Sequence, residues 1–138
     1  MRGEFGSVQF SLHEPFESAV ESVCRSLKSR GLRVAGQLDV SRRVRRSLGI
    51  ALPPCRIVFV LPDPSDPGAV NLNPFAASFL PLHIVISGSG AHTEIQVQGR
   101  VCPEPGTDAP ALAAPIMQTQ ARIAEAIEAI AMRPSLVV

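Results

Sequence analysis

The chain has 138 residues, a formal net charge of +1 and 46% apolar residues. This length suits one domain, and the apolar content excludes a wholly disordered protein. Three Cys cannot all pair within one chain, which argues against a disulfide scaffold. Six Phe but no Tyr and no Trp leave few side chains for stacking nucleic-acid bases.

The N-terminus and the most apolar stretch bear on location. Glu4-Phe5 and Gly6-Ser7 are dipeptides that common cloning sites encode. We therefore interpret residues 1–7 as an expression scar, with a native disordered terminus as the alternative, and residues 8–138 as a single α+β domain. The most apolar stretch, 76–86, has 11 residues, whereas a membrane helix needs about 20. With no signal-peptide pattern either, we expect a cytoplasmic protein that does not enter the membrane.

Strand and helix signals alternate in the first half of the chain. From Pro15 onward, apolar residues recur at helical spacing, with acids early and bases late, until Gly31 supplies a stop. Ser41 can cap a short basic helix that Gly49 closes. Uniformly apolar residues over 57–61 suit a strand covered on both faces. The predicted elements are a strand over 8–12, a helix over 15–30, a strand over 32–40, a helix over 41–48 and a strand over 57–61.

The second half predicts a hairpin and a long helix. Gly88-Ser89-Gly90 turns the chain between two apolar stretches, which makes part of the sheet antiparallel. The predicted elements are a loop over 62–74, a short helix to Leu80, strands over 82–87 and 93–98, a loop over 103–109 and a helix over 111–132. Together they predict an α+β fold with a mixed, partly antiparallel sheet and two main helices packed on one face.

The order and spacing of these elements resemble a known family, domain of unknown function 302, over residues 8 to about 103. The resemblance rests on the Phe-containing helix that ends at Gly31, Leu38-Asp39-Val40, Leu48-Gly49, Arg56-Ile57-Val58, and Leu80-Pro81 before an apolar strand. It implies a compact α+β domain and a homodimer.

Two stretches depart from the family's pattern. Leu80-Pro81-Leu82-His83 stands where the family typically reads Leu-Pro-Cys-Asn, and Leu61-Pro62-Asp63-Pro64 stands where it reads Cys-Asn-Pro. A function that depends on those polar groups is therefore not expected in this chain.

Positive charge is concentrated in the middle of the chain. From Arg25 to Arg56, nine basic residues and one acidic residue, Asp39, give +8, while four basic and eleven acidic residues elsewhere give −7. Four arginines of this segment are candidate ligand-binding residues, because guanidinium groups match phosphate oxygens: Arg42, Arg43, Arg45 and Arg46. The alternative is a solvated face, or pairing with acids elsewhere in the chain or on a second subunit. Nucleic-acid binding is not expected, given the missing Tyr and Trp.

His83 is the other candidate ligand-binding residue. It lies on the strand face opposite Leu82 and Ile84, with Glu94 and Gln96 expected on its own side. A neutral imidazole there could bind a ligand, a metal ion or haem, or act as a base. The alternative is a hydrogen-bonded histidine on a partly covered sheet face.

The cysteines follow no metal or redox motif, since neither C-x-x-C nor a zinc spacing occurs. Cys24 suits the core, and inert thiols are the favoured interpretation of Cys55 and Cys102.

The last helix carries an apolar stripe, which packs either on the chain's own sheet or along a dimer seam. The stripe consists of Ile116, Ile123, Ile127 and Ile130.

The sequence thus predicts a homodimeric, non-catalytic binding or interaction module for a small ligand, without a predicted catalytic residue or metal site and with no identified cofactor. The alternatives are a haem- or metal-binding protein that uses His83, and a small thiol-dependent enzyme that uses Cys55 or Cys102.

Overall fold

The computed structural model describes residues 8–61, 82–97, 109–131 and 134–136. The interpretation of residues 1–7, the loops and short helix predicted over 62–80, and Cys102 lie outside the described residues. The described elements, in chain order, are β1 (Val8–Leu12), α1 (Phe16–Ser29), β2 (Arg33–Asp39), α2 (Val40–Leu48), β3 (Cys55–Leu61), β4 (Leu82–Ser89), β5 (His92–Val97), α4 (Ala109–Glu128) and β6 (Pro134–Leu136).

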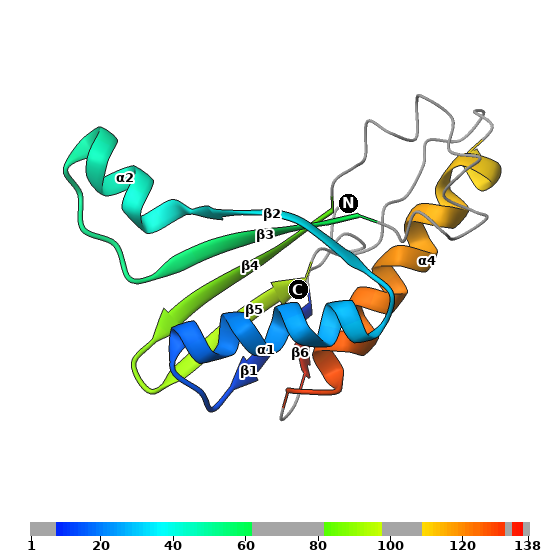
Figure 1. Cartoon of the computed structure of the whole chain (residues 1–138), viewed down its shortest axis with the longest axis horizontal. Helices are drawn as coiled ribbons and strands as arrows, with labels where there is room; N and C mark the ends of the chain where they lie inside the picture. Colours follow the sequence, from blue (N-terminus) through cyan, green and yellow to red (C-terminus); the bar gives the residue numbers. More distant parts are fainter. Residues whose placement is uncertain (1–7, 62–81, 98–108, 132–133, 137–138) are drawn as a thin grey trace.

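The strands form one sheet in the order β2-β3-β4-β5-β1-β6, shown in Figure 1. The α+β fold predicted from the sequence is confirmed. Every described strand pair is antiparallel, whereas the sequence suggested a mixed sheet. The reason lies in α2: it is inserted between two neighbouring antiparallel strands, β2 and β3, and does not carry the chain across the sheet as the helix of a parallel βαβ unit does.

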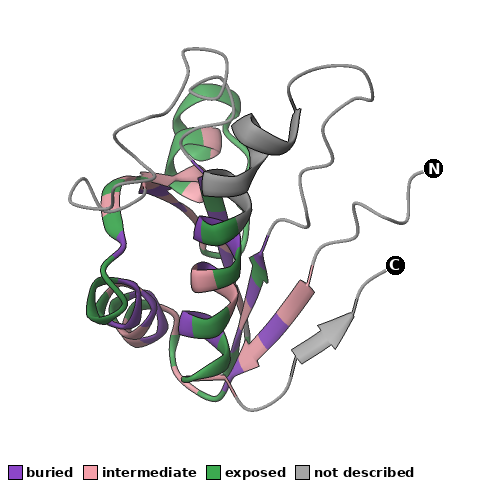
Figure 2. Cartoon of the chain, turned by 90° about the vertical axis from the view of Figure 1, so that its right-hand side faces the viewer, coloured by how far each residue is buried: buried purple, intermediate pink, exposed green. Residues whose placement is uncertain are grey.

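One face of the sheet is covered by α1 and α4, as the side view of Figure 2 shows. Alternate residues of the strands point to this face because side chains in a strand alternate between its two sides. They form the core together with residues of both helices. The fully buried strand residues include Phe10, Leu12, Val58, Val60, Ile84, Ile86 and Ile95.

The opposite face of the sheet is more open. Ile57 and Phe59 of β3 and Val85 of β4 are half-buried, and His83 is exposed. The expectation that the strand over 57–61 is covered on both faces was therefore wrong. An apolar run is as compatible with one fully buried face and one half-buried face as with two buried faces.

Helix α1 follows its sequence pattern closely. Its buried face holds Val20, Val23 and Leu27, and Gly31, with φ of 76°, ends it. The hydroxyl of Ser26 donates a hydrogen bond to the backbone oxygen of Ala126 in α4, at 2.6 Å. This buried bond fixes the two helices against each other.

Candidate functional site: a basic arm beside an open sheet face

Residues 40–54, which we call the arm, leave the sheet between β2 and β3 and project away from the rest of the molecule (Figure 1). The arm begins with α2. Asp39, rather than the expected Ser41, caps this helix, because its carboxylate accepts hydrogen bonds from the Arg42 backbone N–H and the Ser41 hydroxyl, both at 2.9 Å. Those two bonds are the main reason that the pKa of Asp39 lies below its ordinary value of 3.8. Gly49, with φ of 68°, closes the helix as predicted.

The arm exposes both charge and apolar surface. Helix α2 has no buried residue, and its principal contact within the chain is with β3. The four candidate arginines are all exposed on it: Arg42, Arg43, Arg45 and Arg46. Three large apolar side chains at and after the end of α2 are also exposed, at 68% for Leu48, 51% for Ile50 and 37% for Leu52. The arm therefore carries a charge of +4 and an uncovered apolar surface.

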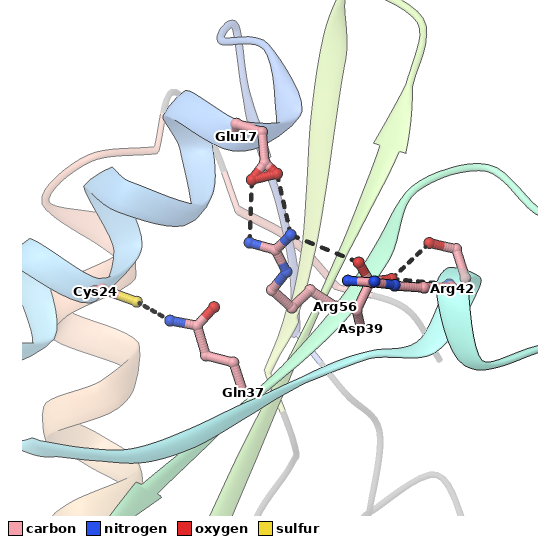
Figure 3. A network of polar contacts seen from close by, with 7 residues as sticks. Glu17, Cys24, Gln37, Asp39, Arg42 and Arg56 are labelled. Carbon is pink, nitrogen blue, oxygen red and sulfur yellow. Dashed lines mark hydrogen bonds and ion pairs between the residues drawn. The ribbon is translucent and has the colours of Figure 1, made fainter.

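The base of the arm is held to the body of the protein by Arg56 (Figure 3). Its guanidinium donates two hydrogen bonds to the Glu17 carboxylate of α1, at 3.0 and 3.1 Å, and lies 3.8 Å from an Asp39 carboxylate oxygen. It also lies 5.3 Å from the centre of the Phe16 ring, within cation–π range. One arginine thus connects α1, β3 and the cap of α2. The sequence counted Arg56 within the basic segment but gave no sign of this joint.

His83 lies apart from the arginines. It pairs with Phe59 in β3, four residues from Cys55, where the chain returns from the arm. At a rise of about 3.3 Å per residue, this places His83 roughly 13 Å from the base of the arm. The two sets of candidate ligand-binding residues therefore do not form one site.

Glu94 is also distant from His83, although both lie on the open face. Glu94 pairs with Ser87, four residues along β4 from His83. Its carboxylate accepts hydrogen bonds from the hydroxyl of Ser11, at 2.9 and 3.1 Å, and from the amide of Gln9, at 3.1 Å. The sequence placed His83 and Glu94 on the same face, which the register confirms, but could not reveal that β1 supplies the partners of Glu94.

The two described thiols are poorly suited to nucleophilic chemistry. Burial raises the pKa of Cys24, against smaller opposing effects of Lys28 and Arg56. Burial also raises the pKa of Cys55, and the negative charge of Asp39 adds to this. A reactive cysteine needs a lowered pKa, because the thiolate is the nucleophile. Cys24 instead accepts a long hydrogen bond, 3.6 Å, from the Gln37 side chain.

The isoleucine stripe of the last helix packs within the chain. Ile123 and Ile127 are buried in the core, and Ile130 packs against it. Of the two alternatives, packing on the chain's own sheet and a dimer seam, these residues follow the first. The side chain of Ile116 lies outside the described part of the chain.

Two further features are absent from the described residues. No group of three or more His, Cys, Asp or Glu side chains there could hold a metal ion. No described helix combines the length and the apolar character that crossing a bilayer requires.

Comparison with known proteins identifies relatives for the fold. No curated protein matches the chain. Among solved structures, it is similar to the crystal structure of an uncharacterized conserved DUF302 protein from Bacillus stearothermophilus, with a TM-score of 0.69 and 21% sequence identity. The similarity covers 88% of this chain and 95% of that one. The model of the family "Domain of unknown function DUF302" matches residues 8–130. This chain belongs to the DUF302 family.

Proposed function

We propose that this chain is a homodimeric, non-catalytic interaction module in which the arm of each copy packs against the other copy and offers its arginines to a small anionic ligand. The observation that carries the proposal is the arm itself. A nine-residue helix with no buried residue ends at the exposed Leu48 and is followed by two more exposed large apolar side chains, Ile50 and Leu52.

Such a helix has little to hold it in place within one chain. Isolated helices shorter than about 12–15 residues are marginal in water, and most helical stability comes from packing an apolar face. In the arm, Val40 and Val44 are half-buried, but Leu48 and Ile50 are largely in solvent. Fully burying one such side chain contributes about 1.5–3 kcal/mol. Burial of these side chains against another molecule therefore stabilises the arm substantially.

A second copy fits as the covering molecule because of charge. The arm carries four arginines and no acid, while the part of the chain outside Arg25–Arg56 carries −7. Exposed carboxylates lie on the two body helices: Glu21 on α1, which also exposes Arg25 and Lys28, and Glu128 on α4, together with Glu125, which forms an ion pair with Arg30 at 3.5 Å. Contact of one arm with the other is opposed by +4 on each, whereas contact of each arm with the exposed carboxylates of the partner's body helices is favourable. A reciprocal contact of this kind closes as a dimer with twofold symmetry.

The mass in solution tests the dimer. Sedimentation velocity should give about twice the 14.7 kDa of the chain. The double variant Leu48→Ser/Ile50→Ser should sediment near the single-chain mass with an unchanged circular dichroism spectrum. As a matched control, Val85→Ser removes half-buried apolar surface from the open sheet face and should remain dimeric. A monomeric wild-type protein at 100 μM, or a dimeric double variant, would contradict the proposal.

The anionic ligand has a separate test. Planar guanidinium groups bind phosphate or carboxylate oxygens through paired hydrogen bonds. Calorimetric titration with inorganic pyrophosphate should give binding that Arg43→Gln/Arg46→Gln abolishes and His83→Gln preserves. Equal binding by the arginine variant would show that the arm is not the anion site. Loss of binding in His83→Gln would move that site to the open sheet face.

A further inference from the structure

We propose that His13 and His92 form a two-imidazole binding site for a divalent transition-metal ion such as Zn²⁺. The two residues lie far apart in the sequence and meet at one end of the sheet. His13 directly follows β1 and His92 opens β5. Leu12 pairs with Thr93 in the antiparallel register, so the next pair in that register is His13 opposite His92.

The two imidazole rings are already in contact. Their centroids lie 4.3 Å apart, with an angle of 59° between the ring planes. Both residues are exposed, so their rings can turn toward a shared ion without opening the core. Among the described residues, no hydrogen bond engages either ring. Their nitrogens are therefore open to a ligand on this side of the molecule.

The backbone that carries the two rings is fixed. The hydroxyl of Thr93, a buried residue, donates to the backbone oxygen of Glu14, at 2.9 Å. The Glu14 carboxylate in turn accepts hydrogen bonds from Ser18 and Ser22 of α1, at 2.7 and 3.0 Å. His92 is held by its pairing with Ser89 across a tight turn at Gly90, whose φ is 63°. A site on anchored backbone loses little conformational freedom when it binds.

The chemistry of the pair selects the class of ion. Neutral imidazole nitrogen is a ligand of Zn²⁺, Cu²⁺ and Ni²⁺, whereas Mg²⁺ and Ca²⁺ prefer oxygen. Within the described residues no third His, Cys, Asp or Glu completes the group. The described residues therefore supply two ligands, one fewer than a catalytic zinc site, and leave the remaining positions of the ion to water or to a bound molecule.

The chain's three histidines give this proposal a clean test. Titration of the full chain with Zn²⁺, followed by calorimetry and by NMR of the histidine ring protons, should show one ion per chain, with the His13 and His92 signals shifting together. His13→Gln and His92→Gln should each weaken binding by more than about tenfold, since loss of even an outer-shell partner costs 10–100-fold. His83→Gln is the matched control and should bind as the wild type does.

Several outcomes would overturn the site. Undiminished binding in His13→Gln and His92→Gln, loss of binding in His83→Gln, or absence of any ring shift at millimolar Zn²⁺ would each do so. Both substituted residues are exposed, and circular dichroism of each variant checks that folding is unchanged. A Cu²⁺-loaded sample adds an independent readout, because its electron paramagnetic resonance spectrum should show two coupled nitrogens in the wild type and one in either variant.

Discussion

The body of the protein, formed by the sheet with α1 and α4, and the arm differ in how they use apolar residues. In the body, alternate residues of every central strand are buried against the two helices, and Val58, Ile84 and Ile95 have no exposed surface. In the arm, α2 has no buried residue, and Leu48 is 68% exposed. The body contains what it needs to fold as one unit. The arm contains caps at both ends of its helix, but the contact of that helix with β3 leaves none of its residues buried.

This difference separates folding from association. Residues that stabilise the body should act within each chain and independently of protein concentration. Apolar residues of the arm should act between chains, through the mass-action stabilisation that any partner of the folded state provides. The following substitutions sharpen or break that distinction, in order of decreasing effect.

Two isoleucines make the most direct comparison. Ile84 is fully buried in β4, while Ile50 is 51% exposed in the arm. Ile84→Ala should lower the free energy of unfolding by about 2–5 kcal/mol, because it leaves a cavity in the core. Ile50→Ala should change it by less than about 0.5 kcal/mol when single chains unfold at low protein concentration. Urea denaturation of both variants measures this, and a large loss from Ile50→Ala at low concentration would place the arm within the cooperative core.

The bond between α1 and α4 gives the next largest effect. Ser26→Ala removes the hydroxyl that donates to the Ala126 carbonyl and leaves that buried oxygen without this donor. We expect a loss of about 1–3 kcal/mol, the usual cost of an unsatisfied buried polar group. Ser29→Ala, whose hydroxyl bonds to Ser26 within the same helix, is a control that should cost less. Thermal unfolding of the two variants compares them, and equal costs would mean that the helix–helix bond is unimportant.

The ion pair of Arg56 with Glu17, which joins the arm to the body, should contribute less to the free energy of unfolding than the Ser26 hydrogen bond. Glu17 is 69% exposed, and exposed ion pairs typically contribute about 0.2–1 kcal/mol. A double-mutant cycle with Arg56→Met and Glu17→Gln should therefore give a coupling energy in that range at low salt, falling as salt is added. A coupling near zero, or one that does not change with salt, would contradict an ion pair at this joint.

The cap of α2 predicts a small, local pH effect. Hydrogen bonds lower the pKa of Asp39 in the folded state, so its capping contribution is present at pH above the ordinary value of 3.8. That contribution is lost as the pH falls through the lowered value. NMR shifts of the α2 backbone should move toward random coil below about pH 4, while those of β4 stay unchanged. In Asp39→Asn, which still caps but does not titrate, the α2 shifts should not follow this transition.

The sequence predicted the body better than the arm. The helix over 15–30 was confirmed closely, since periodic burial acts locally. The predicted hairpin was also confirmed, but its turn lies at Gly90-Ala91, and Gly88 and Ser89 belong to β4. The antiparallel pairing of β2 and β3 was not predicted, because a strand-helix-strand pattern is the same whether the helix crosses the sheet or projects from a hairpin. Strand β6 was missed because Pro134-Ser135-Leu136 is too short to show an alternation.

The candidate sites also divide into those that depend on neighbouring residues and those that depend on distant parts of the chain. The four arginines could be placed on one helix because they are neighbours in the sequence. The contact of His13 with His92 and the hydrogen bonds of Glu94 depend on β1 lying beside β5. That register joins distant parts of the chain, and nothing in the local pattern of either strand specifies it.

Hydrogen exchange of the arm at two protein concentrations tests the account most directly. We expect the α2 amides near Arg45 and Arg46 to be protected at 100 μM and to exchange rapidly after dilution to the nanomolar range, while amides of β3 and β4 remain protected at both. That result would show that a second copy stabilises the arm. Equal protection of α2 at both concentrations would contradict the account, because the arm would then be stable within a single chain.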